Sequence, residues 1–186
     1  MAKVGEVTVA IPQGIEVVVE GKTVTVKKGD KALTRAFSAP GVTFLREGDA
    51  VKVLAKKVTR RSSAVVQAMA SHIRNLVTGV EKGYEYRLEV VYSHFPMNIA
   101  VKGDVVEIVN LGGGKYPLKA RIIGKTRVEV KGKDVVVKGL DKEDTGQTAA
   151  NIERAARIRG KDKRVFQDGI YLVQKGMVQG AQGEGK

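Results

Sequence analysis

The sequence predicts an α+β protein of two tandem duplicated domains, each a small antiparallel sheet with one main helix. Three observations support this expectation. Ile11-Pro12 is echoed by Phe95-Pro96, and the two prolines are 84 residues apart. Short runs of alternating apolar and polar residues follow each proline, and each half then contains one stretch with helical periodicity.

The alternating runs predict half-buried antiparallel strands. In residues 23–27 (TVTVK) and 127–131 (RVEVK) apolar and polar side chains alternate, so one face of each strand is suited to a core. Gly21-Lys22 and Gly132-Lys133 lie between neighbouring runs. Because glycine tolerates the positive φ of tight turns, each pair predicts a hairpin.

Each half contains one predicted helix. In the first, apolar residues recur at three- and four-residue spacing, with Ser62 or Ser63 as a cap at the start and Gly79 at the end. In the second, Asp144 with Gln147 three residues later resembles a capping box. The apolar stripes are Val66, Met69, Ala70, Ile73, Leu76 and Val77 in the first helix, and Ala149, Ile152 and Ala156 in the second.

A further strand is expected to close each half, over Tyr86–Tyr92 in the first and over Gly169–Val173 in the second. The predicted domains are therefore residues 1–92 and 93–175, each long enough to fold. Residues 176–186 form a Gly- and Gln-rich tail that we expect to be flexible, because it is too poor in apolar residues to fold alone.

Composition limits the classes of function. The 186 residues include no cysteine, so disulfides, Cys-ligated zinc and thiol catalysis are excluded. Neither His72 nor His94 lies in a triad or metal-ligand pattern, so we predict no catalytic residue, no metal and no cofactor. No long apolar run or signal-peptide pattern is found, which predicts a soluble cytoplasmic protein with no membrane partner. The formal net charge of +13 favours a polyanionic partner.

The excess positive charge is concentrated in two short segments. Lys56–Arg61 holds four cations and no acid, and whether it contacts RNA or only solvent stays open. The second segment holds six cations against Asp162 and continues past the predicted helix, which favours contact with a polyanion. Arg154, Arg157 and Lys161 would share one helix edge if the helix extended that far. The six cations are Arg154, Arg157, Arg159, Lys161, Lys163 and Arg164.

A glycine-rich loop is the second candidate site. Gly112, Gly113 and Gly114 precede Lys115, and three glycines let a backbone approach a ligand closely and expose its N–H groups. On sequence grounds a flexible hairpin tip is the simpler interpretation of these four residues.

Two other functions stay open at this stage. A small phosphate-handling enzyme would combine the glycine-rich loop with Asp141, Glu143 and Asp144, although acids just before a helix are better explained by its dipole. A free RNA or DNA chaperone would carry the same charge and bind a similar partner. Charge alone does not separate these functions from that of a protein bound to one RNA.

The closing stretch of the chain adds a resemblance to a known family. Residues 151–154 (NIER) lead to residues 164–172 (RVFQDGIYL), and Arg60–Ser63 and His94-Phe95-Pro96 extend the pattern. With the two-fold repeat, these motifs resemble the large-subunit ribosomal protein six family in its archaeal and eukaryotic form. The resemblance covers roughly residues 1–175.

The resemblance implies a structural protein of the large ribosomal subunit, without a small-molecule substrate, that acts in translation in the cytoplasm. Its C-terminal domain would bind large-subunit rRNA near the sarcin–ricin loop and the stalk base, beside neighbouring ribosomal proteins. The six cations would be the main rRNA contacts and Gly112–Lys115 a second contact. Phe166 would pack the loop that presents the cations, and Asp168-Gly169 would form a turn before the last strand.

Overall fold

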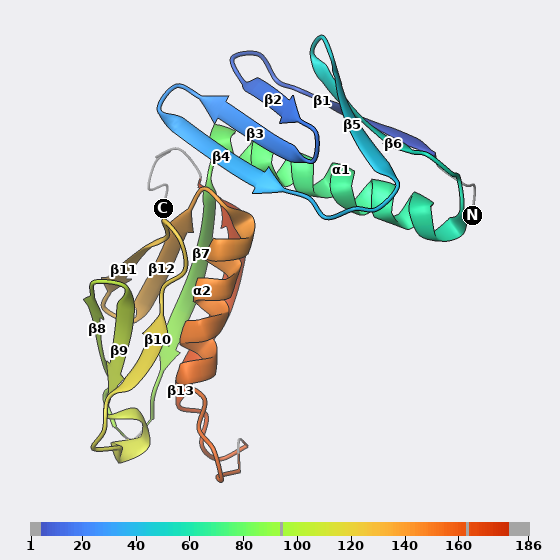
Figure 1. Ribbon diagram of the computed structural model, residues 1–186. Coiled ribbons are helices and arrows are strands. Elements are labelled where there is room, and N and C mark those ends of the chain that lie inside the picture. The colour runs from blue at the N-terminus through green and yellow to red at the C-terminus, as the bar shows by residue number, and fades with distance from the viewer. Residues whose placement is uncertain (1–4, 94, 163, 179–186) are drawn as a thin grey trace, which may run out of the picture. The chain divides into compact units, whose positions relative to one another are not determined.

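The computed structural model describes residues 5–93, 95–162 and 164–178 (Figure 1). The chain divides into two compact units, Met1–Glu81 and Lys82–Lys186. In the described residues, each unit combines antiparallel strands with one α-helix, which confirms the predicted α+β class. None of the helices in these residues has the length and apolar character needed to cross a membrane.

The first unit consists of six strands in two sheets and one helix. Its elements are β1 (Glu6–Ala10), β2 (Glu16–Glu20), β3 (Thr23–Lys28), β4 (Lys31–Ala36), β5 (Val42–Glu47), β6 (Ala50–Ala55) and α1 (Arg60–Glu81). The sheets have the orders β2-β3-β4 and β1-β6-β5, and α1 packs against strands of both. Their apolar faces form one core, in which Val17, Val51 and Ile73 are fully buried.

Helix α1 begins with a reciprocal pair of hydrogen bonds. The N–H of Ser62 donates to Oγ1 of Thr59 (3.1 Å), and the N–H of Thr59 donates to Oγ of Ser62 (2.8 Å). Thr59 is therefore the cap, and Ser62 supports it from the first turn. The prediction that Gly79 ends the helix is wrong, because the buried stripe continues to Val80. Gly83, with a φ of 77°, follows the last turn.

The second unit has a four-stranded sheet, a three-stranded sheet and one α-helix. Its elements are β7 (Tyr84–Val91), β8 (Asn98–Lys102), β9 (Val105–Val109), the 3-10 turn η1 (Leu111–Gly113), β10 (Leu118–Arg121), β11 (Arg127–Lys131), β12 (Asp134–Gly139), α2 (Lys142–Ala155) and β13 (Gly169–Met177). The sheets have the orders β11-β12-β7-β13 and β10-β9-β8, and α2 packs against strands of both. The predicted hairpins are confirmed, with φ of 60° at both Gly21 and Gly132.

Strand β7 belongs to the second unit, which corrects the predicted boundary after residue 92. It lies between β12 and β13, with Leu88 opposite Val135 on one side and Leu172 on the other. Its alternate side chains are buried in the second core. A strand at the centre of a sheet folds with that sheet, so the chain divides before β7 and not after it.

Helix α2 starts three residues earlier than predicted. Its N-cap is Asp141, whose Oδ1 accepts a hydrogen bond from the N–H of Glu143 (2.8 Å). Gln147 does not complete a capping box with Asp144, because its Nε2 donates to Oδ1 of Asn151 one turn later (2.9 Å). The acids at the start of α2 therefore cap the helix and complement its dipole, as we expected from their position just before a helix.

The last strand runs further than predicted. Gly176 and Met177 pair with Glu85 and Tyr84 of β7, so the expected flexible tail does not begin at residue 176. A bulge between Leu172 and Gln174 shifts the register within the strand. Residues 179–186 of the predicted tail lie outside the described residues.

Candidate nucleic-acid interface

The structure brings part of each predicted group of site residues together in the second unit, namely Gly112 of the loop and four cations of the basic segment. Figure 1 shows η1 and the chain that follows α2 at the same end of this unit. A hollow of about 470 Å³ lies between them and is named here the basic groove. Its lining residues are Leu111, Gly112, Leu118, Lys119, Arg154, Ala155, Arg157, Ile158, Arg159 and Lys161.

The chain after α2 is irregular, which corrects the predicted helical ridge. Helix α2 ends at Ala155, and the almost fully buried Ala156 closes its last turn. Arg154, Arg157 and Lys161 therefore do not share one edge of a helix. All three residues instead line the basic groove.

The glycine-rich loop and the basic segment meet at Gly112 and Ile158. Gly112 has a φ of 55°, and a Cβ atom there would lie 3.7 Å from Cδ1 of Ile158. Ile158 thus packs against the backbone of Gly112. The positive φ of Gly112 would strain any residue that carries a side chain. Asn110 also has a positive φ (66°), and its Nδ2 donates to the carbonyl of Pro96 (3.1 Å). These contacts fix the turn that forms one side of the groove.

The other three residues of the glycine-rich loop lie beside the groove rather than in its lining. Gly113 has a φ of 80°, and a Cβ atom there would lie 3.4 Å from the half-exposed ring of Phe95. The N–H of Gly114 donates to the carbonyl of Leu111 (3.0 Å), and Lys115 is exposed. The loop is therefore a hydrogen-bonded turn rather than a plain hairpin tip.

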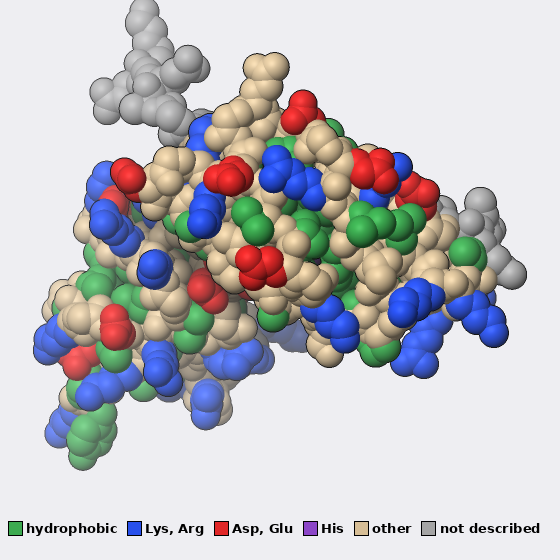
Figure 2. Space-filling view, turned by 45° about the horizontal axis from the view of Figure 1, so that its top comes forward, with side chains coloured by type: hydrophobic (Ala, Val, Ile, Leu, Met, Phe, Trp, Pro, Cys, Tyr) green, Lys and Arg blue, Asp and Glu red, His purple; other side chains and the backbone are tan. Residues whose placement is uncertain are grey.

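The described cations of the second basic segment are exposed. In the part of the chain that the structure describes, none of them forms an ion pair with a carboxylate. Cations on the sheets differ: Lys102 pairs with Glu107 (2.6 Å) and Lys138 with Glu129 (3.1 Å). Figure 2 shows such mixing of basic and acidic side chains over much of the visible face. The described cations of the segment are Arg154, Arg157, Arg159, Lys161 and Arg164, and Lys163 lies outside the described residues.

Lys119 is a groove residue that sequence analysis missed. Its Nζ lies 4.0 Å from Oε1 of Glu107, whereas Nζ of Lys102 lies 2.6 Å from Oε2 of the same carboxylate. The hydrogen bond from Lys102 holds the pKa of the Glu107 carboxyl below its ordinary value. Glu107 is thus bound mainly to Lys102, and Lys119 adds its charge to the groove. Alternation along β10 marks Lys119 as outward-facing, but it does not show what Lys119 faces.

A tight turn holds the far end of the basic segment. The carbonyl of Asp162 accepts hydrogen bonds from the N–H groups of Val165 (3.2 Å) and Phe166 (2.9 Å), and its Oδ1 accepts one from the N–H of Arg164 (2.9 Å). Nζ of Lys161 lies 4.6 Å from the ring centroid of Phe166. The only acid in the segment therefore shapes its backbone, and Phe166 packs against the segment as the resemblance implied.

Asp168-Gly169 is not the predicted turn. Gly169 is the first residue of β13, and a Cβ atom there would lie 3.2 Å from the carbonyl oxygen of Ala156. Asp168 is 3% exposed, and its Oδ1 accepts a hydrogen bond from the N–H of Ser93 (2.9 Å). The pair therefore joins the end of α2, the exit of β7 and the start of β13. Sequence analysis missed this anchor because its partner lies 75 residues away.

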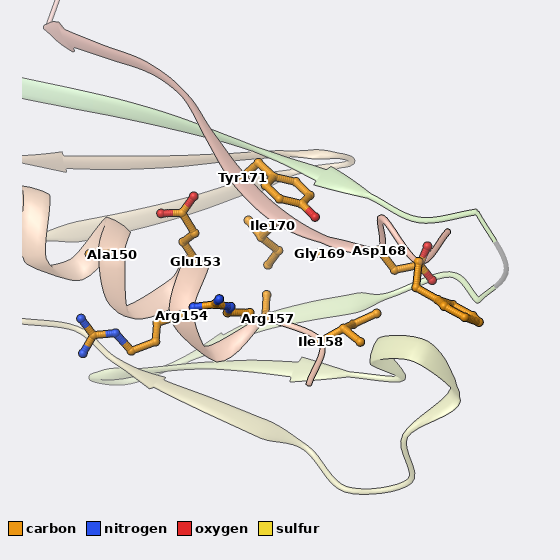
Figure 3. A pocket seen from close by; sticks show the side chains of 11 residues that line it. Ala150, Glu153, Arg154, Arg157, Ile158, Asp168, Gly169, Ile170 and Tyr171 are labelled. Carbon is orange, nitrogen blue, oxygen red and sulfur yellow. The ribbon is translucent and has the colours of Figure 1, made fainter. Parts of the chain in front are cut away.

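A second hollow adjoins the groove between α2 and β13 (Figure 3). This hollow, the α2–β13 pocket, has a volume of about 360 Å³ and shares Arg154, Arg157 and Ile158 with the basic groove. Its lining residues are Ala150, Glu153, Arg154, Ala156, Arg157, Ile158, Phe166, Asp168, Gly169, Ile170 and Tyr171.

Metal binding has no support in the described residues. Across residues 5–93, 95–162 and 164–178, no group of three or more His, Asp or Glu side chains is arranged to hold a metal ion. His72 packs 6.1 Å from the ring of Phe37 within the first unit. His94 lies outside the described residues.

Comparison with known proteins decides the family. The family model described as ribosomal protein L6 matches residues 95–169 of this chain. Large ribosomal subunit protein uL6 of Methanocella arvoryzae is 47% identical over 168 residues, which cover 90% of this chain and 95% of the relative. The chain belongs to the ribosomal protein L6 family. The uL6 proteins of Methanospirillum hungatei and Thermoplasma acidophilum are 46% and 43% identical, each over 91% of this chain and over 97% and 95% of their own lengths.

Membership in the ribosomal protein L6 family confirms the predicted class, a structural, non-enzymatic protein of the large ribosomal subunit. The residues that match the family model, 95–169, include the glycine-rich loop and the whole second basic segment. The contacts of individual residues with rRNA stay predictions.

Proposed function

We propose that this member of the ribosomal protein L6 family binds large-subunit rRNA through the end of its second unit, with the basic groove as the main contact surface. The observation that carries the proposal is the meeting of the basic segment with the glycine-rich turn in one hollow. Four cations of the segment and Lys119 line it together with the backbone of Gly112. Phosphates supply most of the affinity of such surfaces, and cations beside exposed backbone are their usual partners.

The charge pattern supports a groove for the RNA backbone rather than a merely solvated face. A solvated face gains solubility from mixed charges, as on the sheets, where lysines pair with glutamates. The four groove cations that belong to the basic segment stand without carboxylate partners in the described residues, and Lys119 shares Glu107 with Lys102. Their mutual repulsion is relieved when a polyanion binds, and counterions are released at the same time.

The resemblance extends the proposal to a place in the ribosome. The second unit is the main rRNA-binding domain, and it lies near the sarcin–ricin loop and the stalk base, in contact with neighbouring ribosomal proteins. Gly113, Gly114 and Lys115, beside the groove, and Arg164, outside its lining, extend the contact surface. Lys163, which lies outside the described residues, stays a predicted rRNA contact.

A salt titration tests the proposal. The full-length chain is bound to a large-subunit rRNA fragment that contains the sarcin–ricin region, and the dissociation constant is measured over a range of salt concentrations. With about five phosphate contacts, log affinity falls against log salt with a slope of about −4 to −5. A flat salt response would overturn the proposal. Sedimentation of cell lysate provides a second readout, because a large free pool of the protein contradicts a ribosomal constituent.

A further inference from the structure

We infer that the α2–β13 pocket receives one unpaired base of the RNA that lies in the basic groove, and that guanine fits it best. The inference rests on the proposed function, because the RNA backbone in the groove brings the base to the pocket. It adds a site that recognises one base to a surface that otherwise contacts phosphates.

The two hollows share a wall, which links backbone binding to base binding. Arg154, Arg157 and Ile158 line both the groove and the pocket. Figure 3 shows Arg154 on the last turn of α2 and Arg157 just beyond it, at the edge of the pocket. When the phosphate of a nucleotide contacts these guanidinium groups in the groove, the pocket lies on the other side of the same residues, within reach of its base.

The size of the pocket selects a small ligand. Its volume of about 360 Å³ is near the lower end of the range of about 300–1,000 Å³ that small-molecule sites occupy. One base with part of its sugar fits such a space, whereas a dinucleotide cofactor does not. A single base that leaves its stack is the RNA element of this size.

The lining suits a flat aromatic ring. Ala150 and Ile170 supply apolar walls, and Phe166 and Tyr171 supply aromatic rings. The hydroxyl of Tyr171 donates to the carbonyl of Gln167 (3.0 Å), so this ring is held in place before any ligand binds. Proteins bind unpaired bases by stacking them on aromatic rings and guanidinium groups, and both kinds of group line the pocket.

Glu153 favours guanine among the four bases. Figure 3 shows its carboxylate extending toward β13, where the N–H of Leu172 donates to Oε1 in a long hydrogen bond (3.5 Å). A carboxylate accepts hydrogen bonds and does not donate, so it prefers a base edge with two adjacent N–H donors. Guanine has this pair on its Watson–Crick edge, at N1 and N2. Asp168, the other acid of the lining, already accepts a hydrogen bond from Ser93.

Nuclear magnetic resonance of the ¹⁵N-labelled full-length chain tests the inference with simple probes. GMP, AMP, CMP, UMP and inorganic phosphate are titrated separately. We expect GMP to shift the amide signals of Gly169–Leu172 and of the last turn of α2, with an affinity several-fold higher than that of the other nucleotides. Inorganic phosphate should shift signals of the groove alone. The same shifts with all five probes would overturn the inference, because they would report phosphate binding only.

Two variants test the pocket without removing the groove cations. Ala150→Leu fills the pocket from α2 with a good helix former, and Ala68→Leu on the exposed face of α1 is its matched control. We expect Ala150→Leu to remove the GMP shifts in Gly169–Leu172 and to weaken binding of the rRNA fragment about 5- to 100-fold. Glu153→Gln should keep nucleotide binding and lose the preference for GMP.

The outcomes separate this inference from the proposed function. If Ala150→Leu folds and binds the rRNA fragment like the control, the pocket does not hold a base of that RNA, while a steep salt slope still supports the groove. If GMP binds but the wild-type chain shows a flat salt response, the site takes a free nucleotide and the inferred RNA source is wrong. Loss of guanine preference in Glu153→Gln, together with weak rRNA binding by Ala150→Leu, supports both.

Discussion

The two basic segments differ in how the fold uses their charge. Lys56–Arg61 leads into α1, so Arg60 and Arg61 lie in the first turn, where the helix dipole is positive and no acid is present. Arg154 lies in the last turn of α2, where the dipole favours a cation. Each placement changes helix stability by about 0.3–1 kcal/mol, with opposite signs. The second segment therefore concentrates charge without a cost to its helix.

The comparison shows that the number of cations is a weak guide to a binding surface. The described cations of both segments are exposed, and within the described residues none of them forms an ion pair with a carboxylate. What distinguishes the second is the tertiary structure around it: Gly112 and Lys119 complete a concave surface with it. Around the first, Thr59 caps the helix, and Oγ of Ser62 donates to the carbonyl of Lys57 (2.7 Å), which supports a helix start.

The largest expected effect comes from reversing charge in each segment. Arg157→Glu with Lys161→Glu replaces two groove cations with acids, which loses two charge-assisted contacts and adds repulsion from phosphates. We expect rRNA affinity to fall about 100-fold or more. The matched pair Lys56→Glu with Lys57→Glu changes the total charge equally and should cost less than about tenfold. Equal losses would mean that the second segment is not the main rRNA-binding surface.

Removing the buried carboxylate of Asp168, which anchors the chain that follows the basic segment, should have the next largest effect. Asp168→Ala leaves the N–H of Ser93 without its buried acceptor, and we expect the second unit to lose about 1–3 kcal/mol of stability. Asp104→Ala, an exposed position in the same unit, is the control and should change stability by less than about 0.5 kcal/mol. Denaturant unfolding measures both. A stability loss as small as that of the control would show that Asp168 does not hold the segment.

The glycine at the groove tests whether its shape matters apart from its charge. Gly112→Ala and Gly103→Ala both place a side chain at a positive φ, 55° and 57°, so each should cost about 1–2 kcal/mol of stability. A Cβ atom at position 103 has no atom within 4 Å, and one at position 112 would lie at ordinary contact distance from Cδ1 of Ile158 (3.7 Å), so neither clashes. The two positions differ because the strained backbone at Gly112 lines the groove, whereas Gly103 does not. We expect rRNA affinity to fall several-fold in Gly112→Ala alone. Equal affinities of the two variants would argue against the groove.

Local elements of the fold could be predicted from the sequence because their causes are local. Alternation and glycine at position 132 are enough for a hairpin, and the apolar stripe of α1 is enough for a helix. The assignment of β7 was wrong because its partners follow later in the chain, and alternation does not name partners. The end of α2 was missed because no glycine or proline lies between Ala155 and Gly160 to mark it.

The candidate site divides in the same way. Clustered cations and consecutive glycines are visible in the sequence, so the basic segment and the loop were found. The rest of the site depends on contacts between residues far apart in the sequence. These contacts bring the loop and the segment together at Gly112 and Ile158, add Lys119 to the groove and form the pocket beside Tyr171. No periodic pattern records such contacts, so the groove and the pocket needed the structure.

The smallest expected effect is the change in stability when one cation of the first segment is removed. Arg60→Gln removes a cation from the first turn of α1, and we expect the first unit to gain about 0.3–1 kcal/mol of stability at low salt. Arg74→Gln, exposed in the interior of the same helix, is the control, and its charge lies too far from either end for the dipole to act on it. Thermal unfolding at low and high salt measures the difference, which should shrink as salt screens the dipole. If Arg60→Gln instead weakens rRNA binding as strongly as a groove variant, the unfavourable charge at the start of α1 has a binding role, and the first segment is a second RNA surface.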